Sequence, residues 1–176
     1  MTVSVDISNE LKQAIQRKNI SQVQLSKKIN RSPSTVNAYI KNQPAPIEAI
    51  QDIAEVLNDS MLNVQLANHF FGTIPAMEVT LYQDHPHVLD FLQQVEAEER
   101  KAYKQVALKS LSKQDSCLSK EDLNHILNYA NEYLDEMLIE MRLVMSILSK
   151  ADVSVMQAIN NRKPYWRTEG YLGGKQ

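Results

Sequence analysis

The chain has 176 residues, of which 43% are hydrophobic and 23% are charged. These proportions are typical of globular proteins, so they exclude a wholly disordered chain and a collagen-like fibre. Three of the four glycines lie in the last seven residues, which leaves the body of the chain without a glycine-rich loop that could wrap a phosphate. We therefore expect neither a nucleotide-binding enzyme fold nor a cofactor.

Charge is divided unevenly along the chain, although the net charge is only −2. Residues 1–44 have a balance of +5 and the remaining 132 residues a balance of −7. A basic head on an acidic body is typical of a domain that binds a polyanion, joined to a part that repels it. The alternative is two solvated surfaces of chance composition, and charge alone does not decide between them.

The sequence favours a cytoplasmic protein. No apolar run approaches the roughly 18 residues that cross a bilayer, and residues 1–6 lack the basic and apolar regions of a signal peptide. The one cysteine, Cys117, has no partner for an internal disulfide, which agrees with a reducing compartment. We expect no contact with a membrane.

Apolar periodicity predicts five helices in the first 72 residues. Their approximate ranges are 7–18, 21–29, 32–41, 46–57 and 61–71. Ser21 with Gln24 three residues later predicts a capping box, and Ser32 followed by Pro33 supplies a cap and a first-turn proline. Residues 1–72 are therefore assigned to one helical domain.

A linker is predicted at residues 73–86, where prolines interrupt the helical pattern. Within it, residues 77–82 alternate weakly and are compatible with an extended segment. Residues 87–159 are assigned to a helical hairpin that assembles subunits. Residues 160–176 contain a proline and three glycines without an apolar period, and they predict an irregular arm. The basic and aromatic cluster at 162–167 is interpreted as a docked tail.

The second hairpin helix, which begins at Ser119, has the clearest periodicity. Apolar residues recur at alternating spacings of four and three from Leu123 to Ala151, which is an a/d seam over four heptads. The seam is wider than one partner helix needs, so part of it is expected to contact another subunit. The expected oligomerisation residues are Leu127, Leu134, Met137, Met141, Val144 and Leu148. A hairpin core is the more common use of such a seam, and the sequence leaves both uses open.

Residues 21–42 contain two short capped helices joined by a tight turn. In helix-turn-helix geometry the first helix crosses the DNA backbone and the second enters the major groove. Leu25 and Ile29 can face Val36 across the joint, and Asn30 stands where a left-handed residue is usually needed. This segment is the candidate DNA-binding motif.

With its flanking helices, the segment resembles the phage-repressor (lambda-repressor-like, XRE-type) helix-turn-helix family over residues 7–71. The resemblance implies that Gln22 binds a phosphate, that Ser34, Asn37 and Ala38 point outward from the recognition helix, and that Thr35 and Lys41 reach the sugar-phosphate backbone. Arg31 and Ser32 complete the expected DNA contacts. Ser26 and Pro33 depart from the usual pattern, and Pro33 puts base reading at its position in doubt.

A five-helix head followed by a long helical region also looks like small regulators encoded by temperate phages and prophages. That resemblance implies that the C-terminal helices drive oligomerisation. The predicted protein is thus all-α, and its predicted partners are double-stranded DNA and further copies of itself.

Enzyme and metal sites are not expected. Asp122 and His125 have the i, i+3 spacing of helical di-metal sites, but such sites need two pairs of this kind. His85 and His87 lack a third ligand at a suitable spacing, and Cys117 has no adjacent base.

The sequence therefore predicts a sequence-specific DNA-binding transcription regulator without catalysis, acting as a dimer or higher oligomer. The alternative is a protein-interaction module, an antirepressor or adaptor, that binds its partner through the acidic hairpin.

Overall fold

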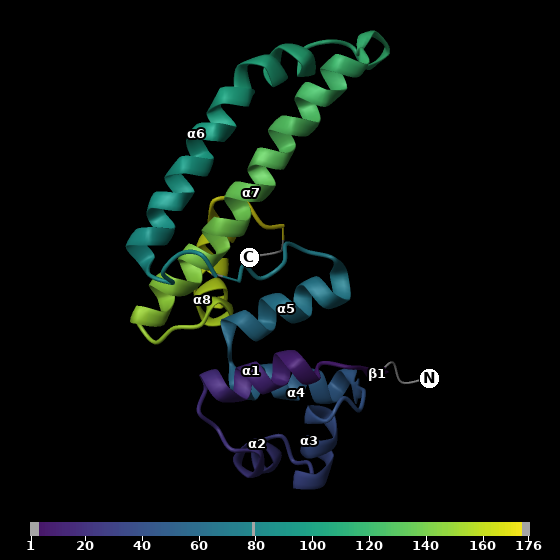
Figure 1. Ribbon diagram of the computed structural model, residues 1–176, viewed down its shortest axis with the longest axis vertical. Helices are drawn as coiled ribbons and strands as arrows, with labels where there is room; N and C mark the ends of the chain where they lie inside the picture. Colours follow the sequence, from purple (N-terminus) through teal and green to yellow (C-terminus); the bar gives the residue numbers. More distant parts are fainter. Residues whose placement is uncertain (1–3, 79, 174–176) are drawn as a thin grey trace. The chain divides into compact units, whose positions relative to one another are not determined.

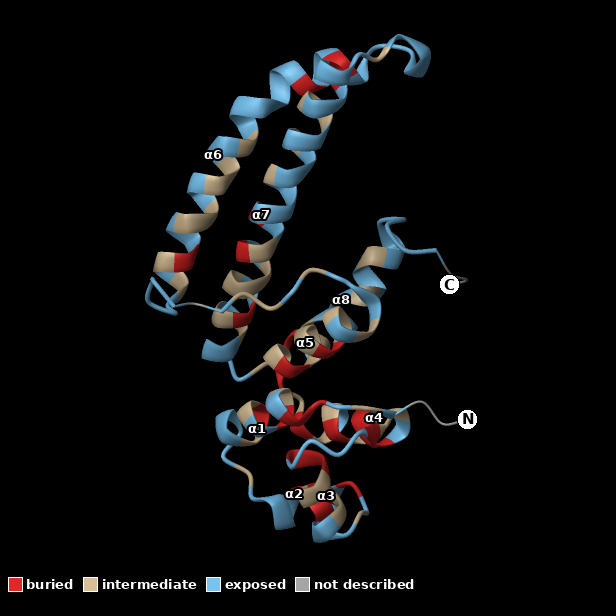
Figure 2. Cartoon of the chain, turned by 45° about the vertical axis from the view of Figure 1, so that its right-hand side comes forward, coloured by how far each residue is buried: buried red, intermediate tan, exposed pale blue. Residues whose placement is uncertain are grey.

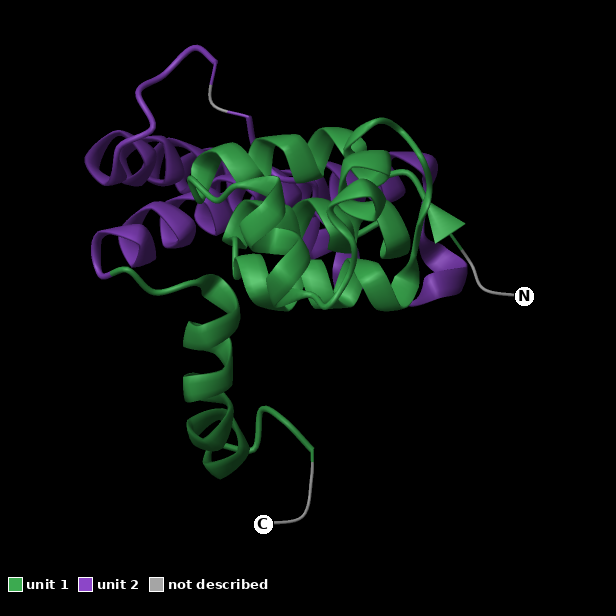
Figure 3. Ribbon diagram, turned by 90° about the horizontal axis from the view of Figure 1, so that it is seen from below, with its two compact units in different colours: residues 1–73, 152–176 green, residues 74–151 purple. Residues whose placement is uncertain are grey.

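The computed structural model describes residues 4–78 and 80–173, which form eight α-helices, a 3-10 helix and one short antiparallel strand pair (Figure 1). The expected all-α class is confirmed. The chain divides into two compact units (Figure 3). One unit contains the described residues up to Thr73 and from Asp152 onward, and the other runs from Ile74 to Ala151. Within the described residues, no helix combines the length and apolar character that crossing a membrane requires.

The head begins with five helices close to the predicted ranges. They are α1 (Ser8–Arg17), α2 (Gln22–Lys28), α3 (Pro33–Ile40), α4 (Ile47–Leu57) and α5 (Ser60–Phe71). Strand β1 (Ser4–Val5) pairs with β2 (Ala45–Pro46), so the start of the described chain is joined to the segment before α4.

Asparagines in the left-handed region follow α1 to α4. Asn19, Asn30, Asn42 and Asn58 have φ values of 48°, 51°, 66° and 45°. Asparagine adopts this conformation at lower cost than other residues with a side chain, apart from aspartate, so it can reverse the chain after each helix. The expected left-handed role of Asn30 is confirmed.

The helix starts agree with the capping signals. Gln24 donates its backbone N–H to Ser21 Oγ at 3.2 Å, and its side-chain oxygen accepts from the Ser21 N–H at 2.9 Å. Ser32 Oγ accepts from the Thr35 N–H at 3.1 Å, ahead of Pro33 at the first helical position. Both predicted caps are confirmed.

One buried cluster joins all five helices of the head (Figure 2). Leu11, Leu25, Val36, Ile53 and Leu62, one from each helix, are fully buried at its centre. The predicted contact surface between α2 and α3 lies within this cluster, and α3 is therefore fixed to the head by its apolar face.

An ion pair ties α1 to the start of α5. Asp59 accepts from the Leu62 N–H at 2.8 Å, which caps α5, and it receives Arg17 Nη2 at 2.7 Å and Arg17 Nε at 3.1 Å. The Asp59 side chain is only 8% exposed. Because one carboxylate satisfies a helix end and a cation together, its loss affects both helices.

Helix α8 (Val155–Thr168) belongs to the head unit and corrects the expectation of an irregular arm at residues 160–176. Ser154 Oγ donates to Asn58 Oδ1 at 2.6 Å, and the Val155 N–H donates to Ser60 Oγ at 3.0 Å. The expected irregular arm is helical up to Thr168 despite Pro164, and only residues 169–173 are irregular, while 174–176 lie outside the described residues.

The hairpin boundary also differs from the expected 87–159. Helix α6 (Pro86–Leu111) and helix α7 (Lys120–Lys150) lie side by side, with the 3-10 helix η1 (Asp115–Cys117) in the connection (Figure 1). The second helix ends at Lys150 because Asp152, with φ at 54°, reverses the chain. The weak extended pattern at 77–82 forms no strand in its described residues, and residue 79 of that stretch lies outside them.

Polar contacts join α6 to α7. Asp122 accepts from Ser110 Oγ at 2.8 Å and from Lys113 Nζ at 2.7 Å. Gln93 Nε2 donates to Glu136 at 3.0 Å, and Arg100 pairs with the same carboxylate. These contacts fix how the two helices are aligned along each other.

The heptad seam of α7 does not form the hairpin core. Leu127 is 59% exposed and Leu134 53% exposed, while Met137 and Val144 are exposed to a similar degree. Met141 and Leu148 are half-buried. The more common use of such a seam, as a hairpin core, is therefore wrong for this protein.

We predict that Asp59→Ala lowers the free energy of unfolding of the full chain by about 2–3 kcal/mol, because it removes an N-cap and the partner of Arg17. Asp52→Ala is the matched control, since Asp52 pairs with Arg31 but its side chain is 48% exposed, and a loss below about 1 kcal/mol is expected. Urea denaturation followed by circular dichroism measures both. Equal losses would contradict the role given to Asp59.

Candidate nucleic-acid interface

Helix α3 divides its residues between the core and an outer face. Val36, Tyr39 and Ile40 are buried, whereas Ser34 is exposed and Asn37 is half-buried. The turn before it is held by the Arg31 N–H, which donates to Ser26 O at 2.9 Å. A rigid helix with a polar outer face is what reading a DNA groove requires.

The first turn of α3 carries a cluster of hydroxyls. Ser32 Oγ lies 2.7 Å from Ser34 Oγ and 2.7 Å from Thr35 Oγ1. Three expected DNA contacts are thus brought together in one turn of the helix.

A surface groove of about 380 Å³ runs beside α3. It is lined by Ser34, Thr35, Ala38, Tyr39, Gln43, Pro44 and Pro46. The sequence reasoning missed Gln43, an exposed amide held by its backbone N–H donating to Ala38 O at 3.0 Å. The sequence signal that could have indicated Gln43 is its position directly after Asn42, because an asparagine there predicts that the chain turns back past α3.

The remaining expected contacts lie at the ends of the two motif helices. Gln22 is the exposed first residue of α2, and Lys41 is the exposed cap at the end of α3. Ala38 is half-buried on α3. Lys27 and Lys28 in the last turn of α2 add exposed positive charge that the sequence reasoning did not assign to DNA.

Arg31 is the exception among the expected contacts. Its Nη2 donates to Asp52 Oδ2 of α4 at 3.2 Å, and its Nε is buried without a hydrogen-bond partner among the described residues. The guanidinium is therefore directed toward α4 and braces the turn. Ser26, which replaces the usual alanine, is buried with its hydroxyl donating to Val23 O at 2.9 Å, so the departure is accommodated locally.

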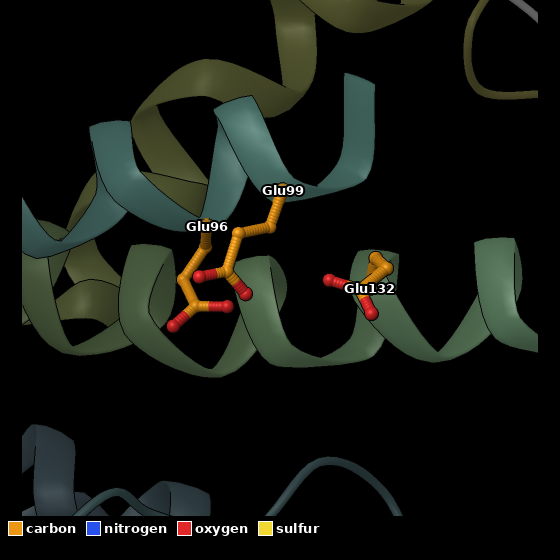
Figure 4. Close-up of side chains that lie close together, drawn as sticks. All are labelled: Glu96, Glu99 and Glu132. Carbon is orange, nitrogen blue, oxygen red and sulfur yellow. The ribbon is translucent and has the colours of Figure 1, made fainter. Parts of the chain in front are cut away.

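The hairpin contains a cluster of three carboxylates that could bind a metal ion, formed by Glu96, Glu99 and Glu132 (Figure 4). One carboxylate oxygen from each lies within 4.8 Å of the others. Burial and the neighbouring carboxylates, Glu99 first among them, raise the pKa of Glu96, and burial likewise raises the pKa of Glu132. Like charges close together disfavour their own ionisation, so these carboxylates repel one another at neutral pH.

The helical pair considered for a metal has another role. The Lys113 ammonium, followed by the backbone and hydroxyl of Ser119, lowers the pKa of Asp122 well below its usual range. His125 lies 4.0 Å from Glu121 on the same helix. Asp122 is thus a cap and an ion-pair partner.

Comparison with known families gives a match in the head. Residues 11–60 match the family described as helix-turn-helix, and this range runs from within α1 to the first residue of α5. The matched segment contains the whole of α2 and α3, and the resemblance to XRE-type domains is confirmed. No curated protein and no solved structure matches the chain.

We predict that Glu96→Gln raises the melting temperature at pH 7 by a few degrees, because it removes one like charge from the cluster. Since the folded pKa of Glu96 is raised above 4.5, the native hairpin gains stability as pH falls toward that value, and the variant should lose part of this gain. Thermal unfolding at pH 7 and pH 5 measures the effect. Glu98→Gln, an exposed partner of Lys101, is the control, and an identical shift there would contradict the prediction.

Proposed function

We propose that this chain, whose head is a helix-turn-helix domain of the XRE type, is a sequence-specific double-stranded DNA-binding regulator of transcription. The observation that carries the proposal is the outer face of α3. Polar side chains, a hydroxyl cluster and a groove lie on this face, while the opposite face is buried in the core. The proposal contains no catalytic step. It places the protein with its DNA in the cytoplasm, as a phage- or prophage-encoded regulator.

Base reading is assigned to the middle of α3. An asparagine can bond bidentately to adenine in the major groove, and a small apolar side chain can contact a thymine methyl group. Asn37 and Ala38 have these chemistries, and Ser34 can bond to any base edge. Arg31 is assigned to bracing the turn against Asp52 instead of to DNA.

Phosphate contacts are assigned to the ends of the two helices. Gln22 offers an amide at the start of α2, Thr35 a hydroxyl in the first turn of α3, and Lys41 an ammonium at the end of α3. Ser32 adds a hydroxyl just before α3 begins. Such contacts set the position of the protein on the duplex but carry no base information directly. Gln43, in the groove beside α3, is added to the proposed interface.

A dimer is proposed because one head reads only a half-site. Two-fold DNA-binding proteins match two half-sites about 34 Å apart, and the exposed seam of α7 supplies an apolar surface for a second copy. The same seam could instead hold a protein partner. Selection of binding sites from random duplexes, followed by a salt titration, distinguishes the functions, since affinity for DNA falls steeply with salt.

We predict that Asn37→Ala weakens binding to the selected site by about 1–3 kcal/mol while binding to random DNA changes little. Gln22→Ala should weaken both equally, because a phosphate contact is independent of sequence. Fluorescence anisotropy at fixed salt measures both variants on both duplexes. Equal losses for Asn37→Ala on the two duplexes would remove it from base reading.

We further predict that Met137→Lys separates the subunits and weakens DNA binding, although the head is unchanged. A charge in the centre of an apolar seam would have to be desolvated on association. Asn128→Lys is the matched control, since it adds the same charge to an exposed position of α7 outside the seam. Sedimentation velocity at micromolar concentration decides the point, and a wild-type monomer would favour the partner-binding alternative.

A further inference from the structure

We propose that two copies of α7 pair antiparallel along the seam from Leu123 to Leu148. This inference rests on the proposed dimer and specifies its partner surface and its orientation. The occupant of the exposed seam is the same seam of a second chain.

Helix α7 has two distinct faces. Asp122, Glu136 and Glu140 bond to residues of α6 or to the α6–α7 connection, and they mark the face used within the hairpin. Leu127 and Leu134 lie outside that face and are more than half exposed. A second helix can therefore cover the seam while the hairpin contacts remain in place.

The positions that flank the seam favour an identical partner. In a coiled coil the e and g residues set partner choice through their charges. The flanking residues are Asn124, Ile126, Asn131, Tyr133, Leu138, Glu140, Met145 and Ile147. Only Glu140 among them is charged, so two copies meet without a row of repelling charges, and a basic partner has almost no complement to bind.

The sizes of the seam residues favour the antiparallel orientation. In a parallel pair Ala130 faces Ala130, which leaves a gap, and Met141 faces Met141. In an antiparallel pair centred between residues 135 and 136, Ala130 faces Met141, so a small side chain meets a long one. Leu134 then faces Met137, and Leu127 faces Val144. Alternating large and small residues across an interface avoids cavities, each of which costs stability.

The orientation also sets the distance between the points where the chains return to their heads. With this antiparallel register the two Lys150 residues lie about 44 Å apart along the helix axis, at 1.5 Å per residue. A parallel pair holds them about 10 Å apart. Half-sites one turn of DNA apart are separated by about 34 Å, so the antiparallel pair gives the attachment points a comparable separation.

Engineered thiols test the orientation in full-length protein carrying Cys117→Ser. Leu127→Cys and Val144→Cys are made singly and together, and oxidised under dilute conditions. Facing thiols can form a disulfide only when their Cα atoms approach within about 7 Å. We expect the double variant to form covalent dimers and the single variants to remain monomeric on denaturing gels. The double variant Asn128→Cys with Ser149→Cys, on an exposed face outside the seam, is the control and should not cross-link.

The outcomes separate the two levels of the proposal. Covalent dimers of the single variants would show a parallel pair and overturn the orientation, while leaving the proposed dimer intact. A dimer in sedimentation with no cross-link in any variant would overturn the seam as the interface. A monomeric wild-type protein in sedimentation would overturn the proposed dimer itself. Circular dichroism of each variant establishes that it is folded.

Discussion

A helix of eight residues is too short to stay folded in water by itself, and α3 therefore depends on the burial of its apolar side. Val36, Tyr39 and Ile40 supply that side, and the cluster formed by the other head helices receives it. Everything on the outer face follows from this constraint. The same packing that stabilises α3 determines which of its residues face outward, so the core holds the outer face of this helix in place.

The head could be predicted closely because its local and non-local signals agree. Ser21 and Ser32 begin helices where the apolar period also begins, and a left-handed asparagine follows each of α1 to α4, where the chain turns. A helix cap is easy to find in a sequence because its two partners lie within three or four residues of each other. The residues on the outer face of α3 could be predicted for the same reason, since they follow from which side of α3 is apolar.

The parts that sequence reasoning missed depend on partners far apart in the chain. Helix α8 is held to the head by Ser154, which donates to Asn58, 96 residues away. In the sequence, Pro164 indicates an irregular segment, and no local pattern indicates this distant contact. The bond between Arg31 and Asp52, 21 residues later, likewise has no local signal in the sequence. The seam of α7 had the right period, but a period does not say which neighbour covers it, and α6 bonds to a different and more polar face.

The hairpin thus buries Leu89, Ala107, Ile139 and Met145 as well as the polar groups that join its helices, while Leu127 and Leu134 of the seam stay exposed. Polar contacts such as Ser110 with Asp122 and Arg100 with Glu136 require specific partners, so they fix one alignment of α6 on α7. Ion pairs of this kind contribute little net stability after desolvation. Apolar contacts stabilise without such selectivity. In the proposed dimer, burial of the seam would add stability to a hairpin that its polar contacts already align, so its folding would be coupled to assembly.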